Sequence, residues 1–311
     1  MYNAGMDGPL SLLLAAPFVV GVLKAPEVPA AKGSARAAPQ AVVVEGPSGG
    51  VLGQDALFAR LAAARVVYVG EKHDEALHHQ VQLEVLKELH ARKPGLVVGL
   101  EMIDRSKQST LDDWQAGHID DDAFKTFWRK AWGFDYALYE PILAYAKANA
   151  IPLKALNAPI SVISKVYRSG LGALIPAERA QLAARVEQTS DPDYLAYIRT
   201  AIEESHGHPT PERMANMLEA QAAWNETMGE SAAQALADGA ETVLVLAGHG
   251  HMAFRAGIAE SVARRRAAAQ AVVIPWPEDG GRAPLADMLR DLRDPAQGRL
   301  RLADYFWLLP D

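Results

Sequence analysis

Five short apolar runs, separated by helical patterns, constrain the fold of this 311-residue chain more than any other feature. The runs are dominated by Val, Leu, Ile and Ala and show little alternation of apolar and polar residues. Such runs are typical of strands that are buried on both faces, as in a parallel sheet. They lie at residues 66–69, 96–100, 151–156, 242–247 and 271–274.

The segments between these runs have helical periodicity. Leu77, Val81, Val85 and Leu89, for example, follow i, i+4 spacing, which places them on one face of a helix. The alternation of strands and helices predicts an α/β fold with an open, mainly parallel sheet flanked by helices.

One long stretch, residues 158–240, contains no strand-like run. It shows only helical pattern, interrupted by prolines such as Pro176 and Pro192. We therefore expect a smaller α-helical lobe inserted at about 158–240 into one α/β domain that spans residues 51–311.

Residues 1–50 differ from the rest and are expected to form a leader and linker. The apolar stretch 10–23 is too short for a membrane-spanning helix, which needs about 18–20 apolar residues. Its length suits the apolar core of a signal peptide, but Asp7 precedes it and the first basic residue is Lys24. Both an exported, periplasmic protein and a cytoplasmic one therefore stay open. Residues 24–50, rich in Ala, Pro and Gly, are expected to be a linker.

Composition excludes several classes of function. A net charge of -7 argues against a nucleic-acid partner, which would require a basic surface. The absence of cysteine excludes disulfides, thiolate metal sites, a catalytic thiol and a lipid anchor through cysteine. A metal ion or haem iron must then be held by His, carboxylate, Tyr or Met.

Polar side chains follow the predicted strands where each strand ends. Glu71 and His73 follow the first run, Glu101 the second and Asn157 the third, and His249 and His251 follow the fourth. Because the carboxyl ends of parallel strands meet at one edge of a sheet, we expect His73, Glu101 and His251 to converge in one cleft. The two G-x-x-H elements, Gly70–His73 and Gly248–His251, favour a bound divalent metal or cofactor; the alternative is that these histidines cap helices or fill turns.

Other histidines and aromatic residues leave alternatives open. At most one of the adjacent His78 and His79 is expected to face the cleft. His206 and His208 form an H-x-H in an apparent loop, either solvated or part of a lid that carries a further ligand. The aromatic stretch 128–145 suits a hydrophobic core or, alternatively, the wall of a planar-ligand pocket. No nucleophile elbow, H-E-x-x-H or Walker loop is present.

At these motifs the sequence resembles the ChaN family of haem-binding uptake proteins, within the wider Tiki/TraB/erythromycin-esterase superfamily. The resemblance is carried, in order, by VYVGEKHD at 67–74, GLEM at 99–102, WGFDY at 132–136, ALNAP at 155–159 and LAGHGHM at 246–252.

The resemblance implies an α/β domain with a helical lobe, haem as the small-molecule ligand, an iron-ligating tyrosine and a homodimer. Tyr139 and Tyr194 are the candidate tyrosines, with His73 as a competing cofactor ligand. Family members are commonly lipoproteins, a feature that a chain without cysteine cannot share in that form. The metalloprotease-like Tiki relatives imply, motif by motif, that His73, Glu101 and His251 hold a metal.

Two hypotheses follow. The first is a haem-binding protein for iron or haem uptake or handling, which would not turn over a substrate. The alternative is a metal-dependent hydrolase with a divalent ion at the paired G-x-x-H site. In that hydrolase Glu71 or His249 would act as the general base toward a metal-bound water.

Overall fold

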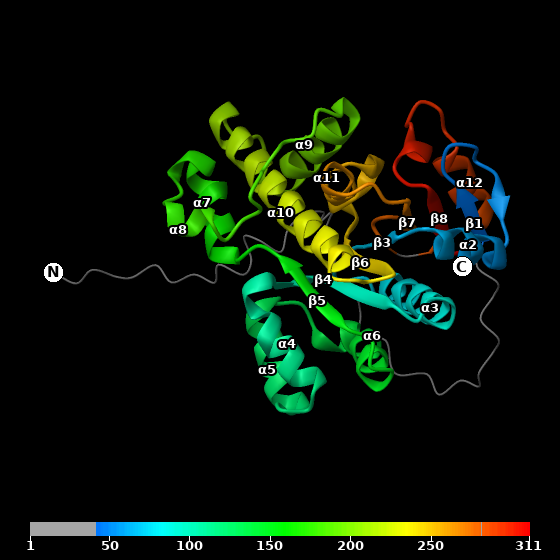
Figure 1. The fold of residues 1–311 in the computed structure, drawn as a ribbon. Coiled ribbons are helices and arrows are strands. Elements are labelled where there is room, and N and C mark those ends of the chain that lie inside the picture. Colours follow the sequence, from blue (N-terminus) through cyan, green and yellow to red (C-terminus); the bar gives the residue numbers. More distant parts are fainter. Residues whose placement is uncertain (1–41, 281) are drawn as a thin grey trace, which may run out of the picture.

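The computed structural model describes residues 42–280 and 282–311, and its centre is an eight-stranded sheet in the order β2-β1-β8-β7-β3-β6-β4-β5 (Figure 1). All neighbouring pairs from β8 to β5 are parallel, whereas β1 pairs antiparallel with both β8 and β2. The expected mainly parallel α/β sheet is confirmed. The strands are β1 (Val42–Glu45), β2 (Val51–Leu52), β3 (Val66–Glu71), β4 (Leu96–Asp104), β5 (Leu153–Asn157), β6 (Thr242–Gly248), β7 (Gln270–Trp276) and β8 (Tyr305–Leu308).

The central strands are apolar throughout because helices cover both faces of the sheet. Every residue of β3 and β6 is buried. Alternate side chains of β3 therefore serve two different cores: Val67 and Val69 pack on one side, and Val66 and Tyr68 on the other.

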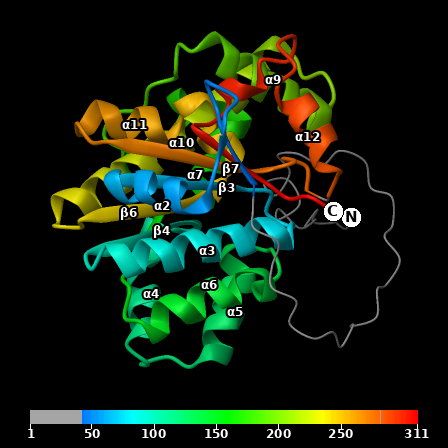
Figure 2. The ribbon, with the colours of Figure 1, turned by 90° about the vertical axis from the view of Figure 1, so that its right-hand side faces the viewer.

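Helices form a layer on each side of this sheet (Figure 2). One layer contains α2 (Gln54–Ala63), α3 (Ala76–Arg92), α4 (Gln108–Gln115), α5 (Asp121–Ala131) and α6 (Tyr136–Ala148). The other contains α9 (Pro192–His206), α10 (Pro211–Ala237), α11 (Ile258–Arg265) and α12 (Leu285–Leu292).

The expected helical insertion lies between β5 and β6. It consists of α7 (Ile160–Ser169), α8 (Pro176–Arg179), α9 and α10, and this part of the described chain has no strand. In Figure 1, α7 and α8 extend beyond the β5 edge of the sheet, while α10 runs back across its face. Pro192 and Pro211 each occupy the first position of a helix, where a missing N–H costs nothing.

Of the eight strands, β1, β2 and β8 were not anticipated. β1 lies inside the stretch 24–50 that we expected to be a linker, and β8 lies near the carboxyl end. Both are short, and β1 gains its hydrogen bonds from β8, a segment at the other end of the chain. The β-branched run VVVE of β1 was a local signal for a strand, and the interpretation of this stretch as a linker missed it. The apolar stretch 10–23 falls outside the described residues, and among those residues no helix is long and apolar enough to cross a membrane.

Candidate functional site

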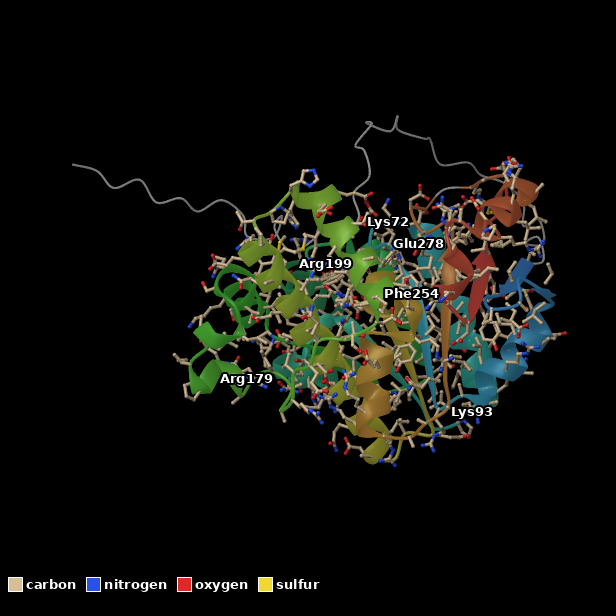
Figure 3. The ribbon with its side chains drawn as sticks, turned by 90° about the horizontal axis from the view of Figure 1, so that it is seen from above. Lys72, Lys93, Arg179, Arg199, Phe254 and Glu278 are labelled. Atoms are coloured by element: carbon tan, nitrogen blue, oxygen red, sulfur yellow. The ribbon has the colours of Figure 1, made fainter. Side chains whose placement is uncertain are left out.

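The polar strand-end residues lie together at the carboxyl edge of the sheet, which Figure 3 shows from above with Lys72, Glu278 and Arg199 labelled. Glu71 ends β3, Glu101 lies in the second half of β4, and His249–His251 form a 3-10 turn directly after β6. The structure thus brings His73, Glu101 and His251 to one place, because parallel strands deliver their carboxyl ends to the same edge.

Glu101 is the centre of one cluster. Its Oε1 lies 3.2 Å from His251 Nε2 and 4.0 Å from His73 Nε2, and its Oε2 accepts the backbone N–H of Gly248 at 2.6 Å. Burial raises the pKa of Glu101, but His251, His73 and the Gly248 N–H together outweigh burial, so the net pKa is lowered. The other ring nitrogen of His251, Nδ1, lies 2.7 Å from Asn225 Oδ1.

Glu71 is the centre of a second, buried cluster. Its Oε1 accepts the Tyr139 hydroxyl at 2.6 Å and lies 2.8 Å from His73 Nδ1. Its Oε2 accepts the Gln82 amide at 2.7 Å and lies 3.2 Å from His79 Nδ1. Burial opposes ionisation, but His79 and His73 hold the pKa of Glu71 well below its usual range. In return, the carboxylates raise the pKa of His73 and His79 against the effect of burial.

His78 and His79 are both buried, on different sides of α3. His79 belongs to the Glu71 cluster, whereas His78 Nδ1 accepts the backbone N–H of Lys72 at 2.9 Å and its Nε2 lies 3.2 Å from the Pro277 carbonyl oxygen. Neither residue lines the pocket described below. The sequence left open that a histidine of this pair is solvated, whereas in the structure both are buried.

The two candidate tyrosines lie in the core. The Tyr139 hydroxyl donates to Glu71, and the Tyr194 hydroxyl donates to the Gly250 carbonyl at 2.9 Å and accepts from Asn225 Nδ2 at 2.9 Å. Burial raises the pKa of Tyr139 well above its usual value and that of Tyr194 to about 12, so both phenols are held neutral.

The metal site that the resemblance implies, at His73, Glu101 and His251, stays a prediction. Across residues 42–280 and 282–311, no three His, Asp or Glu side chains are placed to hold a metal ion. Gly248 leaves room for the His73 ring, because a Cβ at Gly248 would lie 2.9 Å from His73 Cε1 and 3.2 Å from Nε2.

A pocket of about 60 Å³, partly open to solvent, lies over this edge. One wall is α9, which contributes Ile198, Ala201, Ile202 and His206. The opposite wall carries the imidazoles of the strand ends, and Gln221 of α10 also lines the space. The strand-end residues that line it are Glu71, Lys72, His73, Gly248, His249, Gly250 and His251.

The α9 wall was missed from the sequence. His206 was placed in a loop, but it is the last residue of α9. The spacing of Ile198, Ile202 and His206, four residues apart, was the signal that could have identified a pocket-facing stripe. Helix α9 is tied to the strand ends through the Tyr194 hydroxyl and through Tyr197, whose hydroxyl donates to Glu278 at 2.9 Å.

Comparison with known proteins places the chain in a family. The structure described as cofacial haem binding to ChaN of Campylobacter jejuni is similar with a TM-score of 0.65 and 18% identity, over 86% of this chain and 95% of that chain. An erythromycin esterase, EreC, is similar with a TM-score of 0.43 and 11% identity, over 71% of this chain and 72% of that chain.

Among curated proteins, RETICULATA-RELATED 5, chloroplastic, of Arabidopsis thaliana is 25% identical over 257 residues, which is 75% of this chain. The chain spans only 35% of the length of that relative. The family model for haem-binding uptake, Tiki superfamily, ChaN, matches residues 57–262, which is well over half of the 311 residues and runs from α2 into α11. The protein therefore belongs to the ChaN family of the Tiki superfamily.

Proposed function

We propose that this protein binds haem, and that haem occupies the pocket between α9 and the strand-end histidines. The observation that carries the proposal is the pairing of two unlike walls in one pocket, in a chain of a haem-binding family. Ile198, Ala201 and Ile202 offer apolar contact to a macrocycle, and the facing wall offers imidazoles.

The residues present fit the chemistry of haem. When bound, haem would supply an iron centre that needs an axial donor from the protein, and the pocket-lining imidazoles are such donors. The apolar side chains of α9 would exclude water from one face of the ring, and Gln221 could donate a hydrogen bond inside the pocket.

The proposal includes a role in haem uptake or handling rather than in a reaction. On this reading the protein takes up haem and releases it unchanged, as a monomer or a homodimer, and the stretch 10–23 directs export. Mass measurement with and without haemin tests the dimer. The amino-terminal sequence of protein recovered from the periplasm tests cleavage of the leader.

Titration with haemin, followed by absorption, tests haem binding. We expect a Soret band that saturates in wild type and is weakened by Ile202→Trp, which fills the pocket from its α9 wall. Ile175→Trp is the matched control, because Ile175 lies outside the pocket and is 55% exposed. If both variants bind haemin equally well, haem binds outside this pocket. If wild type shows no Soret band, the proposal that the protein binds haem is wrong.

The hydrolase hypothesis is not favoured. The described residues hold no trio placed for a metal ion, and both oxygens of Glu71 are already engaged by buried donors, which leaves it poorly placed as a base. His249 lies 3.9 Å from Glu278 and burial lowers its pKa. Metal analysis of purified protein, with and without added zinc or manganese, would revive this hypothesis if one ion per chain were retained.

A further inference from the structure

Strand β5 is the last strand at one edge of the sheet formed by residues 42–280 and 282–311, and helix α4 lies beside it (Figure 1). An edge strand presents a row of backbone N–H and C=O groups on the side where the sheet ends. Such a row can pair with an extended segment of another chain, above all when the strand is apolar, as β5 is at Leu153 and Ala155. What covers this row decides whether the sheet can grow beyond β5.

Alternate residues of β5 face away from the rest of the sheet. The Pro152 carbonyl accepts the backbone N–H of Val98 in β4 at 2.9 Å, so the Pro152 carbonyl points inward. Because the direction of the backbone groups alternates along a strand, those of Lys154 also face β4. The residues whose N–H and C=O groups point outward are Ile151, Leu153 and Ala155.

Two glutamines of α4 bind this outward row. Gln108 accepts the Ala155 N–H through its Oε1 at 2.7 Å and donates from its Nε2 to the Leu153 carbonyl at 2.9 Å. Gln115 accepts the Leu153 N–H at 3.0 Å and donates to the Ile151 carbonyl at 2.8 Å. Four successive outward groups of β5 are therefore paired with side-chain amides.

A side-chain amide can stand in for a strand because it carries the same groups as a peptide bond. Each glutamine offers one C=O and one N–H to β5, and it meets one N–H and one C=O there, as a neighbouring strand would. Gln108 and Gln115 lie at the two ends of α4, about two helical turns apart, so both project from one face of the helix. A glutamate at either position could accept the N–H but could not donate to the carbonyl.

We infer that Gln108 and Gln115 occupy the place of a further strand and keep the β5 edge closed to an extended segment of a second copy of this chain. The inference goes beyond haem binding and does not depend on it. It implies that a homodimer of wild-type chains does not form by pairing of two β5 edges. Once the glutamines are replaced, the same edge becomes a surface that fits a strand of another copy.

Replacement of both glutamines by methionine tests the inference. Gln108→Met with Gln115→Met keeps a side chain of similar length and removes the amides, so the four outward groups lose their partners. Sedimentation velocity over a range of concentrations should then show oligomers larger than the species that wild type forms. The matched control is Gln80→Met with Gln181→Met, because both of these glutamines are exposed and lie outside the sheet. The control should form the wild-type species only.

Amide hydrogen exchange separates an opened edge from a weakened strand. At concentrations too low for oligomers, the Leu153 and Ala155 amides of the double variant should exchange faster than in wild type. The Lys154 amide, which faces β4, should exchange at the wild-type rate. In the oligomer the Leu153 and Ala155 amides should be protected again, since a strand of the second copy pairs with them. Either single variant, which frees only two of the four groups, is measured in the same way should the double variant fail to fold.

Three results would contradict the inference. The first is a folded methionine variant that forms the same species as wild type at every concentration. The second is faster exchange at Lys154 together with Leu153 and Ala155, which would show that the glutamines hold β5 in place rather than cover its edge. The third is an oligomer in which the Leu153 and Ala155 amides still exchange fast, because association would then use another surface.

Discussion

At the scale of single residues, the carboxyl edge of the sheet is built from buried charge that is fully partnered. Glu71 and Glu101 are nearly inaccessible, yet each has imidazole and neutral donors around it. A buried carboxylate without such donors would shift its pKa upward and lose its charge. The polar side chains that the sequence placed at strand ends are therefore held in position by their own hydrogen bonds and ion pairs within the protein.

The tyrosine hydroxyls belong to this structure, which gives a first prediction. Tyr139→Phe and Tyr194→Phe each remove a buried hydroxyl and its hydrogen bonds, so each should lower the free energy of unfolding by about 1–3 kcal/mol. The haemin spectrum should stay that of wild type. Urea unfolding and absorption spectra check the two statements.

Tyr136→Phe is the control for this pair. Tyr136 lies on the same helix as Tyr139, and its hydroxyl makes no hydrogen bond within the described residues, so the change should cost less than about 0.5 kcal/mol. Loss of a charge-transfer band in Tyr139→Phe or Tyr194→Phe, with stability retained, would instead identify a tyrosinate ligand.

His78 gives a second prediction, on pH dependence. Burial and the nearby His249 lower the pKa of His78 to about 3, from a usual value of 6.5. Between these values the unfolded chain binds a proton that the folded protein does not. The neutral His78 therefore contributes to the free energy of unfolding, and this contribution is fully present above pH 6.5. It is lost as the pH falls toward 3, by about 1.4 kcal/mol per pH unit.

The measurement is the slope of unfolding free energy against pH between 4 and 6. His78→Gln removes the titrating group, so its slope should be smaller than that of wild type by about 1.4 kcal/mol per unit. The comparison of slopes is independent of any constant loss of stability. Identical slopes in the two proteins would show that His78 is accessible to protons in the folded state.

At the scale of helices and strands, the sequence predicted what local pattern controls. β3, β4, β6 and β7 are apolar runs, and each was recognised as a strand. β8 (YFWL) was not recognised, and it pairs with β7 and with β1 from the other end of the described chain. The convergence of His73 with Glu101 followed from strand polarity alone. The spacing of Ile198 and Ile202 indicates one face of a helix, but it does not say which part of the sheet that face packs over.

The contact between α10 and α11 carries a third prediction. A Cβ at Gly229 would overlap both Oγ and Cβ of the buried Ser261, so the two helices approach closely only because residue 229 has no side chain. Alanine would gain about 1 kcal/mol of helix propensity, but overpacking costs about 1–3 kcal/mol. Gly229→Ala should therefore be destabilising in a thermal melt.

Gly172→Ala is the matched glycine control. Nothing lies within 4 Å of a Cβ at Gly172, so this variant should melt close to wild type. If Gly229→Ala were instead more stable than wild type, the helices would be free to separate and the close contact would not be a constraint.

At the scale of the whole molecule, the helical insertion is continuous with the sheet domain. Helix α10 is the reason: Leu218 and Met228 pack in the core over the sheet, while Ala220 and Ala223 pack against α7. Of the 27 residues of α10, most are buried. Because α10 packs in both cores, unfolding of the lobe would remove α10 from the sheet and expose the apolar side chains that it covers there.

The fourth prediction follows from this shared helix. Residues 42–311 should unfold in one calorimetric transition, with a van't Hoff enthalpy close to the calorimetric enthalpy. Gly229→Ala should move that single transition to lower temperature without splitting it, since the contact it strains lies on α10. Residues 158–240 produced alone should show no cooperative melt, because the face of α10 that packs over the sheet has no partner there. A separate early transition, or a cooperative melt of the excised segment, would show that the lobe is an independent folding unit and that α9 can move away from the pocket as part of it.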